Sequence, residues 1–289
     1  MAVRAILARS CRAKSTEAVI MKTVVCEVQR ILESVTAEAA CIPGTLLYNE
    51  GWLLRLALAA GSSGADCLPF RFEPTARWFS EALLYSAFLP RFRGDQLAES
   101  MTHADGVVGQ FLFDAATKAG LRLEPECSQF VVCEAKVFSG LSAGTKRAPA
   151  FDQAARNVGC MAETLRRAGR PMSLYKSLGF FVLAPASQID AALFSSQMSK
   201  DGIRDRLGKR VQMYDAQSNR KRYVELQKWL DEWALPLVDR MELTCFSWES
   251  VIDAVSKTHA EYGPSLDDFY KLCRRYNAGA GSQSETPCK

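Results

Sequence analysis

The stretch Phe130–Phe138, which reads FVVCEAKVF, limits most strongly what this chain can fold into. It is an apolar run rich in β-branched and aromatic residues, a composition typical of a buried strand. Side chains alternate faces along a strand, so Glu134 and Lys136 share one face and Ala135 points to the other. Burying a charge is costly unless the charge is paired or binds something. Either the strand reaches solvent and the two form an ordinary surface ion pair, or they belong to a functional site.

Two neighbouring segments bear on this choice. Asp105 lies near the start of a second strand-like run, His103–Phe113, and its interval to Glu134 is 134 − 105 = 29 residues, enough for a hairpin that brings both carboxylates together. Downstream, Asp152–Ala168 has the periodicity of a helix and carries Gln153 at its start. These neighbours favour the functional alternative over an isolated surface pair.

Together these segments resemble the PD-(D/E)XK nuclease superfamily, which has the restriction-endonuclease-like fold. The resemblance covers roughly Tyr48–Pro185. It implies that Asp105 and Glu134 hold a divalent metal ion, Mg²⁺ or Mn²⁺, and that Lys136 orients or activates the attacking water. The family pattern has a proline before the first acid, where this chain has Ala104. The signature is short and degenerate, so it is more informative about the fold than about the substrate.

Some branches of this superfamily add a Glu on the helix before the sheet and a Gln on the helix after it. Glu50 and Gln153 match those places. The resemblance therefore implies Asp105, Glu134 and Glu50 as metal ligands, and Asp105, Glu134, Lys136, Gln153 and Glu50 as the catalytic set. From the residues alone, Glu50 in the apolar helix expected at Leu46–Ala60 either pairs with Arg55 or turns toward a site.

Hydrophobic periodicity along the chain predicts an α/β protein. Helices are expected at Lys22–Ala39, Leu46–Ala60, Thr75–Ser86, Asp152–Ala168, Ile203–Tyr214, Tyr223–Trp233, Trp248–Tyr262 and Leu266–Tyr276. Strands are expected at His103–Phe113, Leu121–Leu123, Phe130–Phe138, Ser177–Pro185 and, at a sheet edge, Met241–Trp248. Combined with the resemblance, this order implies a restriction-endonuclease-like αβββαβ core, with a central mixed sheet flanked by helices and with N-terminal and C-terminal helical extensions.

The length of 289 residues allows one large domain with extensions. We expect a flexible N-terminal extension at 1–21, a single nuclease-like domain at 22–262 and a disordered tail at 277–289. The core of the domain is expected at about 46–185, followed by a helical and strand extension at 186–276. Residues 1–20 are basic, with no acid before Glu17, as in an organellar transit peptide. The alternative is an upstream extension, with Met21 as the true start.

Composition narrows the class of protein. Hydrophobic residues make up 48% and charged residues 24%, the balance of a soluble globular protein, and no apolar run is long enough for a membrane helix. The ten cysteines form no Cys-x-x-Cys pair, which argues against a zinc ribbon. Cys133 and Cys160 lie in apolar patterns as buried free thiols, so we expect a reducing, cytoplasmic setting of bacterial type. With two histidines, a Ser-His-Asp site is hard to build.

The net charge of +4 permits a polyanionic partner without requiring one. Basic side chains that would meet a phosphate backbone are Lys146, Arg147, Arg156, Arg220, Lys221 and Arg222, although the basic cluster Asn219–Arg222 is more readily explained as a solvated turn. We expect a Mg²⁺-dependent endodeoxyribonuclease acting on DNA in defence or repair, with a homodimer as one option. One alternative is a non-catalytic nucleic-acid-binding or assembly protein on the same fold. Another is an unrelated α/β protein in which Glu134 and Lys136 are a surface pair.

Overall fold

A computed structural model describes residues 26–36, 41–114, 117–145, 148–216 and 220–278. The chain divides into two compact units, residues 1–49 and residues 50–289, which are described separately. In the first unit, residues 26–33 are helical and lead into the 3-10 turn η1, Ser34–Thr36; a second turn, η2, covers Gly44–Leu46. The proposed transit peptide and Met21 lie outside the described residues. The second unit holds the sheet and every candidate site residue that the structure describes.

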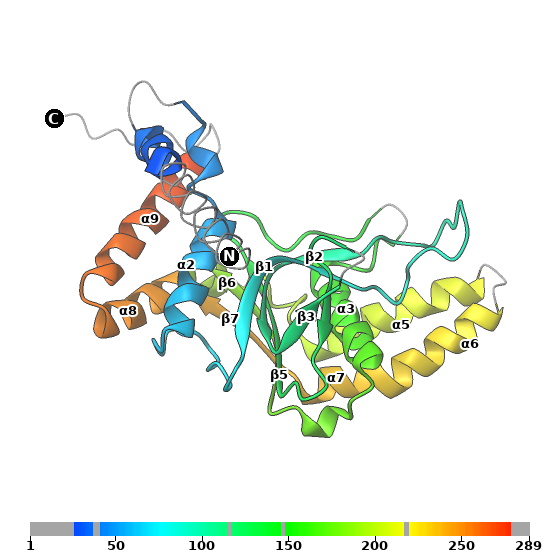
Figure 1. Ribbon diagram of the computed structural model, residues 1–289. Helices are drawn as coiled ribbons and strands as arrows, with labels where there is room; N and C mark the ends of the chain where they lie inside the picture. The colour runs from blue at the N-terminus through cyan, green and yellow to red at the C-terminus, as the bar shows by residue number, and fades with distance from the viewer. Residues whose placement is uncertain (1–25, 37–40, 115–116, 146–147, 217–219, 279–289) are drawn as a thin grey trace, which may run out of the picture. The chain divides into compact units, whose positions relative to one another are not determined.

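The second unit is built on a five-stranded mixed sheet, in the order β1-β2-β5-β6-β7 (Figure 1). The strands are β1 (Arg77–Leu84), β2 (Thr102–Gly109), β5 (Gln129–Ala135), β6 (Ser177–Ala184) and β7 (Glu242–Ser247). The first three strands pair antiparallel, whereas β5, β6 and β7 pair parallel. The carboxyl ends of β5, β6 and β7 therefore meet at one edge of the sheet.

Two helices cover opposite faces of this sheet: α2 (Glu50–Ser62) and α3 (Gln153–Ala168). Gly106 and Cys133 are partners in the β2–β5 ladder, and a Cβ built on Gly106 would lie 3.0 and 3.1 Å from atoms of Leu58 and Leu54, so α2 packs on this face. The next ladder pair, Val107 and Val132, points to the other face and is buried in the cluster that contains α3.

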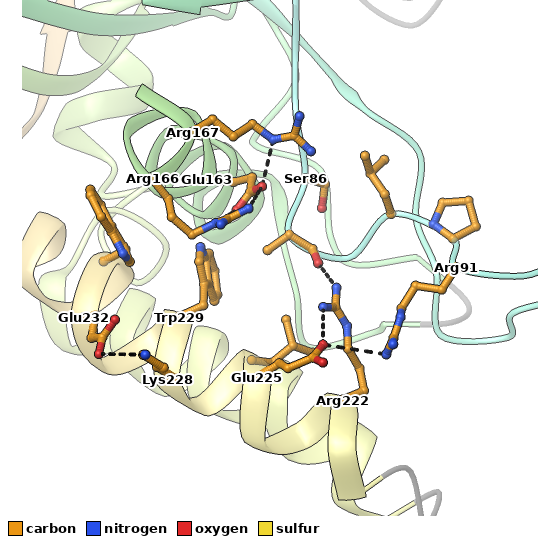
Figure 2. Close-up of a pocket in the computed structure, with 15 residues that line it drawn as sticks. Ser86, Arg91, Glu163, Arg166, Arg167, Arg222, Glu225, Lys228, Trp229 and Glu232 are labelled. Carbon is orange, nitrogen blue, oxygen red and sulfur yellow. Dashed lines mark hydrogen bonds and ion pairs between the residues drawn. The ribbon is translucent and has the colours of Figure 1, made fainter. Parts of the chain in front are cut away.

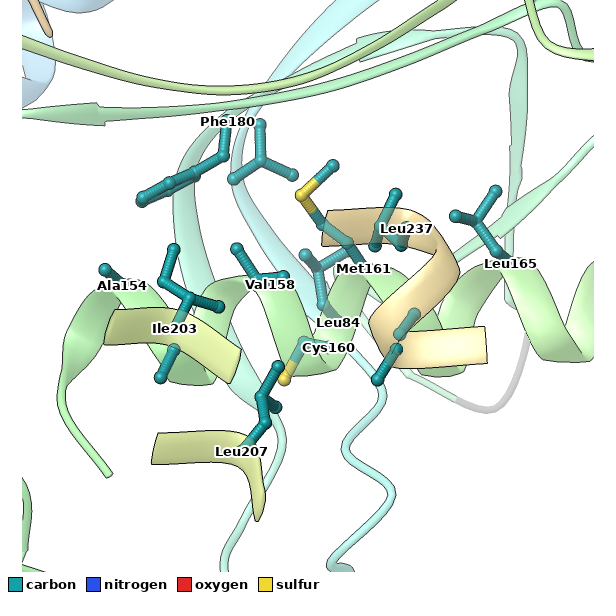
Figure 3. Packing of buried hydrophobic residues seen from close by; sticks show 14 of the residues in the cluster. Leu84, Ala154, Val158, Cys160, Met161, Leu165, Phe180, Ile203, Leu207 and Leu237 are labelled. Carbon is teal, nitrogen blue, oxygen red and sulfur yellow. The ribbon is translucent and has the colours of Figure 1, made fainter. Parts of the chain in front are cut away.

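The core on the α3 face extends past the sheet. Side chains from α3 meet those of β1 and β6 on one side and those of α5 (Lys200–Ala216) and α7 (Leu235–Arg240) on the other (Figure 3). The sides of α3 are therefore covered by both the sheet and the C-terminal helices. The remaining elements are η3 (Met172–Leu174), α4 (Ala186–Asp190), α6 (Arg220–Trp229), the π-helical turn η4 (Leu230–Ala234), α8 (Trp248–Thr258) and α9 (Tyr262–Asn277).

The helix predicted at Thr75–Ser86 is wrong, because most of this segment is strand β1. The run RWFSEALL suits either structure, but Ala82 and Leu84 are buried while their neighbour Leu83 is not, which is the alternation of a strand. Pairing along β2 decides between the two. With β1 as the first strand, the main-sheet strands and the two covering helices follow the order α2-β1-β2-β5-α3-β6, an αβββαβ arrangement once the two short strands of a separate sheet between β2 and β5 are set aside.

The single strand predicted at His103–Phe113 is divided in the structure. β2 ends at Gly109, where φ is 157° and a Cβ would collide with the backbone carbonyl of Gln129. The chain then starts β3 (Phe111–Phe113), which pairs with β4 (Leu121–Leu123) in a separate two-stranded sheet. Leu121–Leu123 is thus a strand, as predicted, but it does not belong to the main sheet.

Other expectations are confirmed. The helix predicted from Asp152 begins at Gln153 with Asp152 as its N-cap, and the strand predicted from Ser177 is β6. Met241–Trp248 contains the edge strand β7. Cys133 and Cys160 are buried free thiols. Among the described residues, none of the helices has the length and apolar character needed to cross a bilayer.

Candidate active site

Asp105 and Glu134 lie opposite each other on adjacent antiparallel strands. The β2–β5 ladder ends at the pair Gly106 and Cys133, and Asp105 and Glu134 are the next residues of the two strands beyond that pair. The Asp105 carboxylate accepts a hydrogen bond of 2.9 Å from the backbone N–H of Ala135, next to Glu134. The two acids therefore come together through the antiparallel pairing of β2 with β5, which is not the simple hairpin expected from the sequence, because β3 and β4 lie between the two strands in the chain.

Glu134 and Lys136 form a buried ion pair. The Nζ of Lys136 lies 2.9 Å from Oε1 of Glu134. The Lys136 side chain is 8% exposed and the Glu134 side chain is 1% exposed. This burial excludes the alternative of an exposed surface pair. A long-range hydrogen bond fixes the strand end that carries the pair. Nε1 of Trp248, the first residue of α8, donates to the carbonyl of Lys136 at 2.8 Å.

The first turns of α3 supply two amides to Glu134. The Asp152 carboxylate caps the helix by accepting from the N–H of Ala155, and it also pairs with Arg206, so the start of α3 is fixed in place. Gln153 donates to Oε1 of Glu134, and its own Oε1 accepts from the N–H of Ser142 at 2.9 Å. Gln153 thus ties Glu134 to the loop that follows β5.

Asn157 is a member of this cluster that sequence reasoning missed. Its Nδ2 donates to Oε2 of Glu134 at 3.3 Å, and the side chain is fully buried. The available signal is its position four residues after Gln153, which places both amides on one side of the helix. Its Oδ1 has no hydrogen-bond partner within the described residues.

Glu50 reaches the same place from the opposite layer. It opens α2, and its Oε2 accepts from the N–H of Val137 at 3.1 Å, just beyond Lys136. The alternative pairing with Arg55 does not occur, because Arg55 instead donates to Ser80 at 2.9 Å and to Glu81 at 3.4 Å. Glu50 therefore joins the β5 strand end.

The ladder between β1 and β2 is interrupted opposite Asp105. Ser80 pairs with Gly106 and Ala82 with Ala104, but Glu81, which stands opposite Asp105 in this register, has a φ of 55°. A positive φ is unfavourable for a non-glycine residue, and such strain occurs more often near functional sites than elsewhere. The sheet is thus locally distorted beside one of the two acids.

Burial and like charges shift the pKa values in this cluster. Burial raises the pKa of the Glu134 carboxyl to about 8; the charge of Asp105 adds to the rise, and Lys136 opposes it. Burial is also the main cause that raises the pKa of Glu50. Burial alone would lower the pKa of Lys136, but attraction to Glu134, Glu50 and Asp105 outweighs it, so the net shift is upward.

The net charge of these side chains suits a divalent cation, but the three carboxyl groups are not gathered around a single point. Asp105, Glu134 and Glu50, if ionised, carry −3 against +1 on Lys136, and −3 + 1 = −2 is the charge that Mg²⁺ would neutralise. Within the described residues, however, no group of three His, Cys, Asp or Glu side chains could ligate one ion. The three-ligand set expected from the resemblance is thus not assembled, because Glu50 is turned to the N–H of Val137.

An adjacent pair of carboxylates is still sufficient for Mg²⁺, which usually takes one or two carboxylates and completes its shell with water and phosphate oxygens. Asp105 and Glu134 provide such a pair, since their carboxyl groups interact directly. Glu50 would then act through water rather than as a direct ligand.

Of the basic residues selected from the sequence, those that the structure describes contact groups outside this cluster. Lys146 and Arg147 lie outside the described residues. Arg156 is half-buried and donates to the carbonyl of Phe151 at 3.4 Å. On α6, Arg220 pairs with Asp215, Lys221 is exposed, and Arg222 contacts Glu225 and the carbonyl of Ala87 (Figure 2). Arg222 therefore belongs to a different part of the unit.

Comparisons with protein-family models, with curated proteins and with solved structures found no match for this chain.

Proposed function

We propose that this chain is a metal-dependent nuclease of the PD-(D/E)XK type, which hydrolyses phosphodiester bonds in DNA. The observation that carries the proposal is the convergence of five residues selected from the sequence. They come from four elements, α2, β2, the β5 strand end and α3. Lys136 and Gln153 contact the buried carboxyl group of Glu134 directly, whereas Asp105 and Glu50 accept from the backbone N–H groups of Ala135 and Val137, on either side of Lys136. These residues are Glu50, Asp105, Glu134, Lys136 and Gln153.

The element order supports the same proposal. The unit runs α2-β1-β2-β5-α3-β6, with three antiparallel strands followed by a parallel one, and the five residues lie where β5 ends. We propose that this is a restriction-endonuclease-like core. Ligands of sheets with parallel strands commonly bind at the carboxyl ends of the strands.

Phosphodiester hydrolysis needs a positioned water and stabilisation of the charge that develops on the phosphate. A divalent ion on Asp105 and Glu134 would supply Lewis acidity and lower the pKa of bound water. Lys136 is placed to orient that water and to stabilise the developing charge, because its ammonium group lies beside Glu134. Gln153 holds Glu134 in position through its amide.

The test is cleavage of linear, circular and single-stranded DNA, and of RNA, by the purified full chain in Mg²⁺ or Mn²⁺ against EDTA. Glu134→Gln and Lys136→Ala are the site variants. Glu242→Gln, on an exposed side chain, and Lys209→Ala, on α5, are matched controls. Metal-dependent products that disappear only in the site variants would support the proposal, and the substrate pattern would separate DNA from RNA and internal from terminal cutting.

One observation favours the non-catalytic alternative, a nucleic-acid-binding or assembly protein on the same fold. Lys136 and Gln153 already engage Oε1 of Glu134, and no three-ligand set is assembled within the described residues. DNA binding without cleavage in any metal, unchanged by Glu134→Gln, would favour this alternative.

A homodimer is part of the nuclease proposal, because two sites are needed to cut both strands at once. Light scattering with and without duplex DNA would measure the oligomeric state.

A further inference from the structure

A cavity of about 710 Å³ lies between α3, the helix α6 with η4, and the segment Ser86–Arg91 (Figure 2). Small-molecule sites commonly have volumes of about 300–1,000 Å³. On α3, Glu163 lines the cavity and lies ten residues after Gln153, which is about 15 Å along the helix. The cavity is therefore separate from the carboxyl cluster around Glu134.

The walls of the cavity carry an excess of positive charge. Five basic residues line it against three acidic ones, so 5 − 3 gives a formal charge of +2. The basic residues are Arg91, Arg166, Arg167, Arg222 and Lys228, and the acidic residues are Glu163, Glu225 and Glu232. Such an excess in a concave surface favours an anionic ligand.

The ion pairs differ between the two sides of the cavity. On α3, Arg166 and Arg167 each donate Nε to the buried Glu163, at 2.7 and 2.8 Å, so these pairs are tight. On the opposite side, Arg91 lies 3.8 Å from Glu225 and Lys228 lies 3.8 Å from Glu232. The side chains of Arg91 and Lys228 are 39% and 72% exposed. Loose, exposed pairs contribute little to stability, so these two cations can turn to a ligand phosphate at small cost.

Two tryptophans provide apolar surface beside these cations. Trp229 and Trp233 both line the cavity. Trp229 is 5% exposed and packs edge-on against Phe88 at 5.5 Å, yet its Nε1–H has no hydrogen-bond partner within the described residues. Buried indole N–H groups usually find an acceptor. A ligand that offers an acceptor would satisfy this donor.

The backbone beneath the tryptophans is irregular. Residues Leu230–Ala234 form a π-helical turn, closed by the N–H of Leu235 donating to the carbonyl of Leu230. Pro236, which follows, has no N–H to donate to the carbonyl four residues earlier. Turns of this kind occur frequently at functional sites. Here the turn carries Glu232 and Trp233, both of which line the cavity.

We propose that this cavity binds a nucleotide. Its base contacts the indole of Trp233 and accepts a hydrogen bond from Nε1 of Trp229, and its phosphate is held by Arg91 and Lys228. Aromatic side chains accept any base by stacking, and arginines match phosphate geometry. The nucleotide is either free or an unpaired nucleotide of a strand, and both sources present the same base and phosphate.

The experiment is isothermal titration calorimetry on the full chain in EDTA, so that no cleavage is required and a failure of the nuclease proposal would not alter the result. The probes are AMP, adenosine, inorganic phosphate and a short single-stranded oligothymidylate. Binding of AMP that is tighter than that of adenosine and of phosphate supports the proposal with a free nucleotide. Binding of the oligonucleotide alone supports it with an unpaired nucleotide of a strand. Equal binding of phosphate and AMP, or no binding of any probe, overturns it.

Variants locate the binding. Trp233→Leu removes the stacking surface and is expected to weaken binding about tenfold. Trp229→Phe keeps the packing but removes the N–H, and is expected to weaken binding about 2–10-fold. The double variant Arg91→Ala/Lys228→Ala is expected to weaken binding and to reduce its salt dependence. Lys209→Ala, on the exposed side of α5, is the matched control. Unchanged affinity in all three cavity variants, with unchanged thermal melts, would overturn the assignment to this cavity.

Discussion

Asp105 and Glu134 face each other across adjacent antiparallel strands, and the negative charge of Asp105 helps to raise the pKa of Glu134. Lys136, on the same face two residues later, pairs with Glu134 at 2.9 Å. Two acids and one amine thus lie together at the end of this strand pair. Because they are shielded from water, the charge of each group is stabilised mainly by the neighbouring groups.

Replacing Lys136 with Met is expected to lower single-turnover DNA cleavage by at least about 100-fold, because the group placed to orient water is lost while side-chain volume is retained. The free energy of unfolding should fall less than for a typical broken buried pair, since Glu134, with its raised pKa, can take up a proton. Lys176→Met, on an exposed lysine, is the control. Full activity in Lys136→Met would remove Lys136 from the catalytic set.

Stability of the metal-free protein is expected to fall as pH rises. The pKa of Glu134 is about 8 in the folded chain, against an ordinary value of 4.5. Between these values the folded state binds a proton that the unfolded state has released, so the free energy of unfolding decreases by up to about 1.4 kcal/mol per pH unit.

Urea melts in EDTA, from about pH 5 to about pH 8, measure this slope. Because the pKa of Glu50 and that of Glu99 are also raised, the contribution of Glu134 is the difference between the wild type and Glu134→Gln. Added Mg²⁺ should flatten the slope, since a bound cation favours the ionised carboxylate. Identical slopes in the wild type and Glu134→Gln would contradict the raised pKa.

Asn157→Ala is expected to weaken Mn²⁺ binding about 10–100-fold, because the amide orients a carboxylate rather than touching the substrate. The rate at saturating Mn²⁺ should recover in part, and KM for DNA should change little. Calorimetric Mn²⁺ titration measures the affinity, with the exposed amide variant Gln227→Ala as control. A large change in KM with unaltered Mn²⁺ affinity would show that Asn157 acts in another way.

Trp248→Phe is expected to lower the free energy of unfolding by about 1–3 kcal/mol, because it leaves the buried carbonyl of Lys136 without its donor. Trp52→Phe is the matched control on a partly exposed indole, where the change should stay within about 0.5 kcal/mol. Chemical denaturation monitored by circular dichroism compares the two. Equal effects would mean that the hydrogen bond to Lys136 contributes nothing to stability.

Much of the architecture follows from local pattern. The buried strand around Glu134, the helix starting at Gln153 and the strand starting at Ser177 lie where the sequence predicts them, because each has a long, consistent hydrophobic period, although the first strand ends at Ala135 and not at Phe138. β1 is the failure. Its eight residues have no unambiguous period, and only pairing with β2 makes them a strand.

The candidate site likewise has features that local sequence predicts and features that only long-range contacts establish. The two-residue spacing of Glu134 and Lys136 places them on one face in any strand, and a hairpin could be expected to bring in Asp105. No local rule places Trp248 against the carbonyl of Lys136, 112 residues away, or Glu50 against the N–H of Val137, 87 residues away. The cavity lined by Trp229 and Trp233 likewise combines three segments, and no local sequence pattern predicts that they lie together.

The sequence by itself determined the α/β class, the strand that carries Glu134 with Lys136 two residues later, and the identity of the candidate residues, because these depend on side-chain periodicity within single elements. Tertiary structure alone decided that β1 is a strand, that Glu50 turns away from Arg55, that Asn157 joins the cluster and that the pKa of Glu134 rises. Each of these depends on which distant groups exclude water or supply a hydrogen bond, and burial and long-range pairing exist only once the chain has folded.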